Sequence, residues 1–145
     1  MRIEFKEEFS LPVQVIFDYF KTPNDWSRLY GAFGAVIDKG DGWYAVPLKR
    51  FPFPLMAKIT ALKTNRLVHW QFKGFWRGEG EVRFNQSNGK VIVEGYEEIS
   101  ILCLFMFSPI VEKLFIQRRF EKVWRYGWRK LHQQEGMVQS LHHME

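Results

Sequence analysis

From residue 35 to residue 101, stretches rich in β-branched and aromatic residues alternate with short connections rich in Gly, Asn, Asp and Lys. In Leu67–Lys73, the apolar residues Val68, Trp70 and Phe72 alternate with polar ones, as in a strand with one buried face. Parallel strands need crossovers of about a dozen residues or more, and these connections are shorter. The segment therefore predicts an antiparallel meander. Its strands are predicted at residues 35–38, 43–48, 55–62, 67–73, 80–85 and 91–101.

One strand and two short helices are predicted before the meander. Arg2–Phe9 alternates apolar with charged residues, which predicts a half-buried strand. The next segment places apolar residues at the i, i+3, i+4, i+7 spacing of one helix face. These residues are Val13, Ile16, Phe17 and Phe20. A second short helix is predicted from residue 24, and it carries Trp26, Leu29 and Tyr30.

The last predicted element is a long helix that runs from Ser108-Pro109 to about Gln134. Its apolar residues form a continuous stripe, which a helix buries against a neighbouring layer. The stripe consists of Ile116, Phe120, Val123, Trp124, Gly127 and Leu131. At 1.5 Å of rise per residue the helix is roughly 40 Å long, enough to cross a whole sheet. The last ten residues, GMVQSLHHME, are expected to form a loose tail.

This order of elements fits a curved antiparallel sheet that holds one long helix. With the segments SLPVQVIFDYFKTPNDW, GEGEVRF and SPIVEKLF, the chain resembles the START-like or Bet v 1-like (SRPBCC) helix-grip superfamily, which includes polyketide cyclases and lipid-transfer proteins. The resemblance covers Arg2 to about Gln134. It implies an α+β helix-grip fold: a curved seven-stranded antiparallel sheet wrapped round a long C-terminal helix, with two short helices between strands one and two. One domain at residues 1–135 and a flexible tail at 136–145 are expected.

The superfamily implies a hydrophobic cavity between the sheet and the last helix, without implying one activity. The strand at 91–101 places carboxylates on both of its faces, so at least one of them is directed toward the core. A desolvated carboxyl has a raised pKa and can act as a general acid or base. Glu97 and Glu98 are therefore the candidate catalytic residues. The expected ligand-binding wall is otherwise apolar and consists of Trp26, Tyr30, Ile59, Trp70, Phe72, Phe84, Phe120 and Trp124.

The two ends of the predicted meander differ in character. The connections at one end are polar turns, whereas those at the other carry aromatic residues beside Lys49, Arg50, Lys73 and Arg77. Two interpretations stay open: the rings plug the core, or they surround the mouth of a cavity as a portal or membrane edge. The rings are Phe51, Phe53, Phe75, Trp76, Phe105 and Phe107.

Residues 99–107 contain one polar residue, Ser100. A spanning helix needs roughly 20 apolar residues, and this run stops at Ser108-Pro109. The N-terminal segment carries charges every few residues, which is not typical of a signal peptide. Cys103 is the chain's one cysteine, which fits a reducing compartment. A cytoplasmic location is expected.

The chain carries a formal net charge of +5, which allows an anionic partner without selecting one. On the last helix, Arg118, Lys122, Arg125 and Arg129 form a basic line. The line is either a solvated outer face or a contact for anionic lipid. A nucleic-acid surface normally interleaves rings with cations, and here Tyr126 alone flanks the line, which disfavours that partner. The aromatic edge allows a homo-oligomer.

Known catalytic signatures are not found in the sequence. It has no Gly-rich phosphate loop, no metal-spaced Cys or His pair within the expected fold and no nucleophile elbow. No cofactor and no metal are expected. The sequence favours a binder or carrier of a hydrophobic small molecule, such as a lipid, an isoprenoid quinone or a polyketide-like compound. The alternatives are a cyclase, dehydratase or hydrolase that uses a cavity carboxylate, and a protein-interaction module that uses the aromatic edge.

Overall fold

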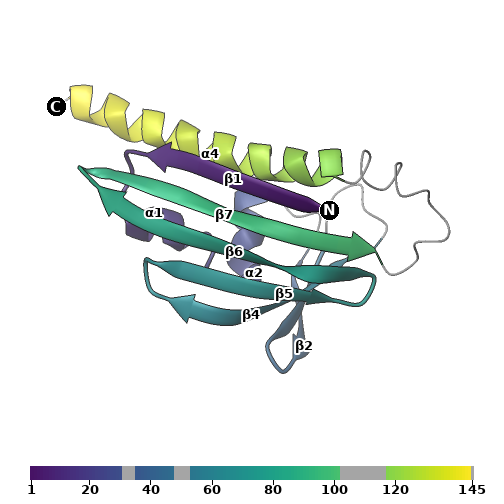
Figure 1. Ribbon diagram of the computed structural model, residues 1–145. Coiled ribbons are helices and arrows are strands. Elements are labelled where there is room, and N and C mark those ends of the chain that lie inside the picture. The colour runs from purple at the N-terminus through teal and green to yellow at the C-terminus, as the bar shows by residue number, and fades with distance from the viewer. Residues whose placement is uncertain (31–34, 48–52, 102–116, 145) are drawn as a thin grey trace.

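The computed structural model describes residues 1–30, 35–47, 53–101 and 117–144. Its described strands form one seven-stranded antiparallel sheet in the order β1-β7-β6-β5-β4-β3-β2. Two short helices, α1 and α2, follow β1, and a long helix, α4, ends the chain (Figure 1). The predicted helix-grip fold is confirmed. The elements are β1 Arg2–Phe9, α1 Val13–Phe17, α2 Pro23–Tyr30, β2 Ile37–Gly40, β3 Trp43–Val46, β4 Leu55–Lys63, β5 Leu67–Lys73, β6 Trp76–Ser87, β7 Lys90–Ile101 and α4 Gln117–Met144.

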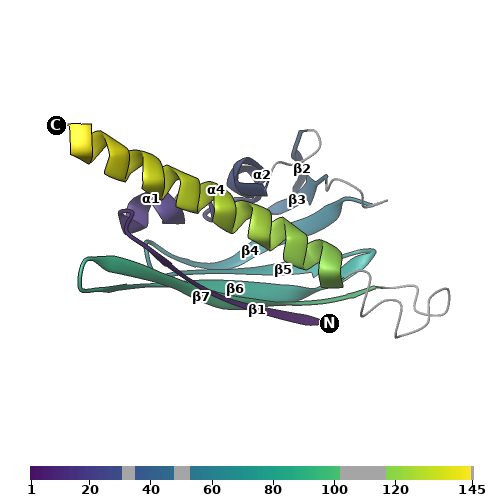
Figure 2. The same cartoon turned by 90° about the horizontal axis from the view of Figure 1, so that it is seen from above.

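Among the described residues, the helices α1, α2 and α4 lie on one face of the sheet, and the other face is open (Figure 2). The residues that point inward along β1 and along β3 to β7 pack against the apolar faces of these helices, whereas all four residues of β2 are exposed. Val68, Trp70 and Phe72 of β5 are all buried, with Trp70 only 2% exposed. The core therefore occupies the layer between the inner sheet face and α4, where the resemblance implied a cavity.

Strand β6 begins four residues before its predicted start at residue 80, because glycines in this part of the chain were interpreted as a loop. Gly78 instead lies in the strand, where a Cβ atom would come within 1.8 Å of the Glu98 carbonyl oxygen. Its φ of +145° is also in the region that favours glycine. A glycine inside a strand often marks the close approach of a neighbouring backbone, and here that neighbour is β7.

The predicted end of the last helix, at about Gln134, was wrong. Helix α4 continues to Met144, through most of the segment that was expected to be a tail. Extending an existing helix costs far less than nucleating one, and this segment contains no proline to stop it. Just before this extension, two contacts hold α4 against the β1 end of the sheet. The backbone N–H of Ser10 donates to Glu135 Oε2 at 2.8 Å, and the His132 ring stacks on the Phe9 ring with their centroids 4.4 Å apart.

Candidate functional site

A small cavity lies between the sheet and α4. It has a volume of about 30 Å³, which is room for about one water molecule. Its wall is formed by α2 and the segment just before it, by the inner sheet face and by α4. The lining residues are Phe20, Trp26, Leu29, Leu55, Trp70, Glu97, Phe120, Val123 and Trp124.

Aromatic rings fill most of the surrounding space. The Trp124 ring of α4 stacks on Phe5 of β1 with centroids 4.4 Å apart and lies 6.2 Å from Phe20 and 6.3 Å from Trp70. Such offset contacts stabilise a core beyond the area that they bury. The cavity is what remains between these rings, so its size depends on their positions.

The Trp70 indole fits at its position because the neighbouring residue on β6, Gly80, has no side chain. A Cβ atom at Gly80 would be 2.4 Å from ring atoms of Trp70, so the indole lies directly against the β6 backbone. Its other neighbour is the Trp26 ring of α2, in an edge contact at 5.1 Å. A side chain at position 80 would push the indole toward the cavity.

Glu97 is the only charged residue that is buried among the described residues, with 6% of it exposed. Strand register places it between Gly80 of β6 and Ile3 of β1, facing inward. The Trp70 Nε1–H donates to its Oε2 at 3.2 Å, and the Trp124 Nε1–H donates to its Oε1 at 3.2 Å.

Burial raises the pKa of the Glu97 carboxyl from its ordinary value to about 7, and the two indole N–H groups oppose that rise in part. Within the described part of the chain, no lysine or arginine forms an ion pair with it. Glu97 is therefore an acid that carries its proton in slightly acidic solution and loses it in slightly basic solution. Groups of this kind cluster at functional sites.

Glu98, the other candidate acid, lies on the opposite face of the sheet. Its carboxylate accepts a hydrogen bond from the Arg2 guanidinium, and 47% of its side chain is exposed. The open question of which carboxylate faces inward is thus answered by the register of β7: Glu97 borders the cavity and Glu98 does not.

Four of the residues expected in the ligand-binding wall border the cavity, namely Trp26, Trp70, Phe120 and Trp124. Phe72 and Phe84 are buried elsewhere in the same core and Ile59 packs against it, while the side chain of Tyr30 lies outside the described residues. Sequence reasoning missed four lining residues, although the apolar spacing of the helices already marked three of them as inward-facing. The missed residues are Phe20, Leu29, Leu55 and Val123.

The expected aromatic edge is only partly described, because Phe51, Phe105 and Phe107 fall outside the described residues. Phe53 is 48% exposed and contacts the half-buried Phe75 at 4.3 Å. Trp76 lies at this edge, where its indole N–H donates to the Phe53 carbonyl oxygen at 3.2 Å, but it is only 2% exposed. Its ring packs edge-on against Phe120 at 5.4 Å, as in the interpretation that the rings plug the core.

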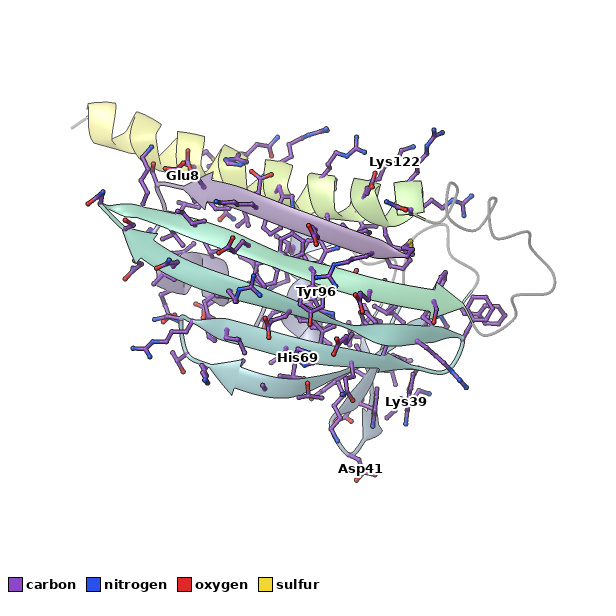
Figure 3. The ribbon with its side chains drawn as sticks, in the orientation of Figure 1. Glu8, Lys39, Asp41, His69, Tyr96 and Lys122 are labelled. Carbon is purple, nitrogen blue, oxygen red and sulfur yellow. The ribbon has the colours of Figure 1, made fainter. Side chains whose placement is uncertain are left out.

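The basic line on α4 faces away from the sheet. Arg118, Lys122, Arg125 and Arg129 are all exposed, and Figure 3 shows Lys122 directed outward from the helix. Arg125 forms an ion pair with Glu121 at 3.5 Å. Within the described residues, no helix is long and apolar enough to span a membrane, and no group of three or more His, Cys, Asp or Glu side chains is placed to hold a metal ion.

No protein-family profile and no curated protein sequence matches the chain. Its fold, however, matches solved structures along almost the whole length of both chains. XoxI from Bacillus cereus aligns with a TM-score of 0.70 at 8% identity, over 95% of this chain and 97% of that one. A START superfamily protein from Mycobacterium smegmatis aligns at 0.63 and 8% identity, over 91% and 97%. The Aha1 dimer from Colwellia psychrerythraea aligns at 0.63 and 12% identity, over 90% and 92%. The chain thus has the START-like helix-grip fold.

Proposed function

We propose that this protein binds or carries a hydrophobic small molecule between the inner sheet face and α4, with Glu97 as the polar anchor. The ligand classes that suit such a site are lipids, isoprenoid quinones and polyketide-like compounds. The observation that carries the proposal is the burial of Glu97 among aromatic rings with no cationic partner in the described residues. The residues proposed to contact the ligand are Trp26, Trp70, Phe120 and Trp124.

A lone buried carboxyl does not serve stability, since removing a charged group from water costs several kcal/mol unless it is paired or neutralised. At Glu97 this cost of removing a charge from water is reduced because the carboxyl group keeps its proton. In that protonated form each oxygen still accepts one indole N–H, and the carboxyl O–H is left to donate. A ligand with a carbonyl or hydroxyl oxygen supplies the acceptor, so the site fits an apolar molecule that ends in one such group.

The size of the cavity sets a condition on this function. About 30 Å³ accommodates the polar end of a ligand and no more, so the rest of a larger molecule must displace rings from the stack. Trp124 is the ring best placed to move, because it is only partly buried and belongs to α4. Ligand uptake should therefore change tryptophan fluorescence.

Native mass spectrometry of freshly purified protein, followed by organic extraction, tests the proposal. We expect a stoichiometric apolar ligand on the wild type, its loss in Glu97→Leu, which has no hydrogen-bond donor, and its retention in the matched control Glu98→Leu. Because protonated Glu97 is the donor, added ligand should bind more tightly as the pH falls through about 7. An apo mass that stays unchanged after incubation with a mixture of lipids and quinones would overturn the proposal.

An enzyme of the cyclase, dehydratase or hydrolase type is the second candidate. It is supported by the pKa of Glu97 at about 7, which suits a general acid or base near neutral pH. In that case the extracted ligand should be chemically converted by the wild type and remain unconverted, though still bound, in Glu97→Gln. Recovery of the same unaltered molecule from both proteins would exclude this alternative.

The proposed setting is the cytoplasm, which the single cysteine of the chain supports. The outward basic line of α4 is proposed to allow peripheral contact with an anionic membrane when ligand is exchanged. The exposed Phe53 supports a protein contact, or a contact between copies of this chain, at the aromatic edge. Liposome sedimentation and sedimentation velocity of Lys122→Glu and Phe53→Ser variants separate these two surfaces.

A further inference from the structure

The open face of the sheet carries a chain of hydrogen bonds that the cavity does not use. It runs across four strands, β4 to β7, and connects Thr60, His69, Glu79 and Tyr96. Figure 3 shows His69 and Tyr96 on this face, on the side of the sheet away from α1 and α2. Thr60 Oγ1 lies 2.6 Å from His69 Nδ1. His69 Nε2 lies 3.1 Å from Glu79 Oε2.

The carboxylate determines which imidazole nitrogen carries the proton. An ionised carboxylate only accepts hydrogen bonds, so His69 Nε2 must be the N–H that donates to Glu79. The second oxygen of Glu79 accepts from the Tyr96 hydroxyl at 3.3 Å. Partial burial, with Glu79 nearby, raises the pKa of Tyr96 and keeps this hydroxyl a donor at neutral pH. Glu79 is therefore held on both of its oxygens.

With the proton on Nε2, a neutral His69 presents the lone pair of Nδ1 to Thr60. The Thr60 hydroxyl then donates to Nδ1 at 2.6 Å. The competing acceptor, the His69 backbone oxygen, is farther away at 3.3 Å. A hydroxyl that donates to a histidine, which in turn donates to a carboxylate, is the arrangement that activates oxygen nucleophiles in proteins.

An irregularity in β4 positions the hydroxyl. The pairing of β4 with β5 shifts by one residue between Ile59 and Ala61, which leaves Thr60 without a partner in the ladder. Such bulges redirect side chains and often lie beside functional groups. Thr60 is exposed, whereas only 19% of the His69 side chain is. The nucleophile is thus accessible while its base is held in place.

We propose that Thr60 is a covalent acylation site, activated by His69 and Glu79, that takes an acyl group from an activated ester or thioester. The Thr60 oxygen forms a bond to the acyl carbon as the bond from that carbon to the leaving oxygen or sulfur breaks. The Thr60 proton passes to His69 Nδ1 and from there to the leaving group. The products are an ester on Thr60 and a free phenol or thiol, without any change of oxidation state.

Because Thr60 lies on an open face rather than inside a pocket, we expect a single acylation and not rapid turnover. The proposal is independent of the hydrophobic cavity, since the two sites lie on opposite faces of the sheet. Loss of acylation would leave the ligand proposal standing, and the converse also holds.

The test uses 4-nitrophenyl acetate at neutral pH, with tryptic peptide mapping of the full chain. Cleavage after Lys58 and Lys63 releases the peptide ITALK, in which Thr60 is the only hydroxyl. Acetylation of Lys63 blocks the second cleavage, so an acetyl group on this short peptide with an intact C-terminal lysine locates the ester at Thr60. The ester is also removed by hydroxylamine, whereas lysine amides are not. Acetylation of surface lysines in the same sample shows that each variant was exposed to the same reagent, and the circular dichroism spectrum of each variant shows whether it is folded.

We expect the acetylated peptide in the wild type and in Thr60→Ser, and its loss in Thr60→Val, which keeps the shape of the side chain. His69→Gln should slow acetylation of Thr60 by about 100-fold or more, the usual contribution of a general base. Glu79→Gln should slow it by a smaller factor while lysine acetylation is unchanged, which a merely structural role would not produce. Acetyl groups on lysines alone in the wild type, or an equal rate at Thr60 in His69→Gln, would overturn the proposal.

Discussion

Glu97 and Glu98 are neighbours on β7 and lie on opposite faces of one sheet, yet their surroundings differ completely. Glu97 points into a layer of aromatic rings and meets two indole N–H groups. Glu98 points to solvent and pairs with Arg2. The inner face is therefore an aromatic layer around one buried acid, while the outer face is a polar network in water. The comparison shows that register, and not residue type, decides which carboxyl has unusual chemistry.

The largest loss of stability is expected when an aromatic ring of the inner face is removed, compared with a ring of the outer face. Trp70→Ala removes a side chain that is 2% exposed and should lower the free energy of unfolding by about 3–5 kcal/mol. The matched control is Trp43, which is partly exposed. The Lys73 Nζ atom lies 4.2 Å from the centroid of its ring. Urea unfolding should show a much smaller loss for Trp43→Ala. Equal losses would mean that the inner rings are not the main support of the fold.

The second prediction uses the pH dependence of stability to compare the two acids. The folded state raises the pKa of Glu97 to about 7 from a reference of 4.5, so between these values the native state binds more protons than the unfolded state. Stability from this group is therefore lost as the pH rises from about 4.5 to about 7. The full difference is roughly 3 kcal/mol, since one pKa unit corresponds to about 1.4 kcal/mol.

Urea unfolding of the wild type, Glu97→Gln and Glu98→Gln at pH 5 and pH 8 measures this contribution. Glu97→Gln should gain stability relative to the wild type on going from pH 5 to pH 8, while the Glu98→Gln difference changes little. Parallel behaviour of both variants would contradict the assignment of the neutral, buried acid to position 97.

Sequence periodicity was enough to predict the element order and the antiparallel meander, because alternation and short connections allow few other arrangements. It was not enough to choose between Glu97 and Glu98, since a shift of one residue in β7 exchanges the two faces. Nor did it locate Thr60 beside His69, which depends on the irregular pairing of β4. The small size of the cavity follows from ring positions that composition alone does not determine.

The third prediction contrasts two glycines. Gly80→Ala places a Cβ atom 2.4 Å from the Trp70 ring, and overpacking of this kind costs about 1–3 kcal/mol. At Gly136, by contrast, a Cβ atom meets nothing within 4 Å. Gly136→Ala within α4 should therefore stabilise the protein by up to about 1 kcal/mol, the difference in helix propensity. Thermal unfolding of both variants checks the opposite signs, and a stabilising Gly80→Ala would mean that the indole is free to move away.

The smallest effect is expected on the outer face. Arg83 pairs with Glu81 at 2.7 Å, but 45% of the Arg83 side chain is exposed, and exposed ion pairs contribute about 1 kcal/mol or less. Arg83→Gln should therefore change the free energy of unfolding by less than about 1 kcal/mol, and added salt should remove most of the difference. The free energies of unfolding of Arg83→Gln and of Arg2→Gln, which removes the hydrogen bond to Glu98, are measured in low and in high salt. These measurements test whether the ion pairs of the outer face contribute independently of one another. In the double variant that carries Arg2→Gln and Arg83→Gln, a loss larger than the sum of the two single losses would show that the pairs of the outer face are coupled.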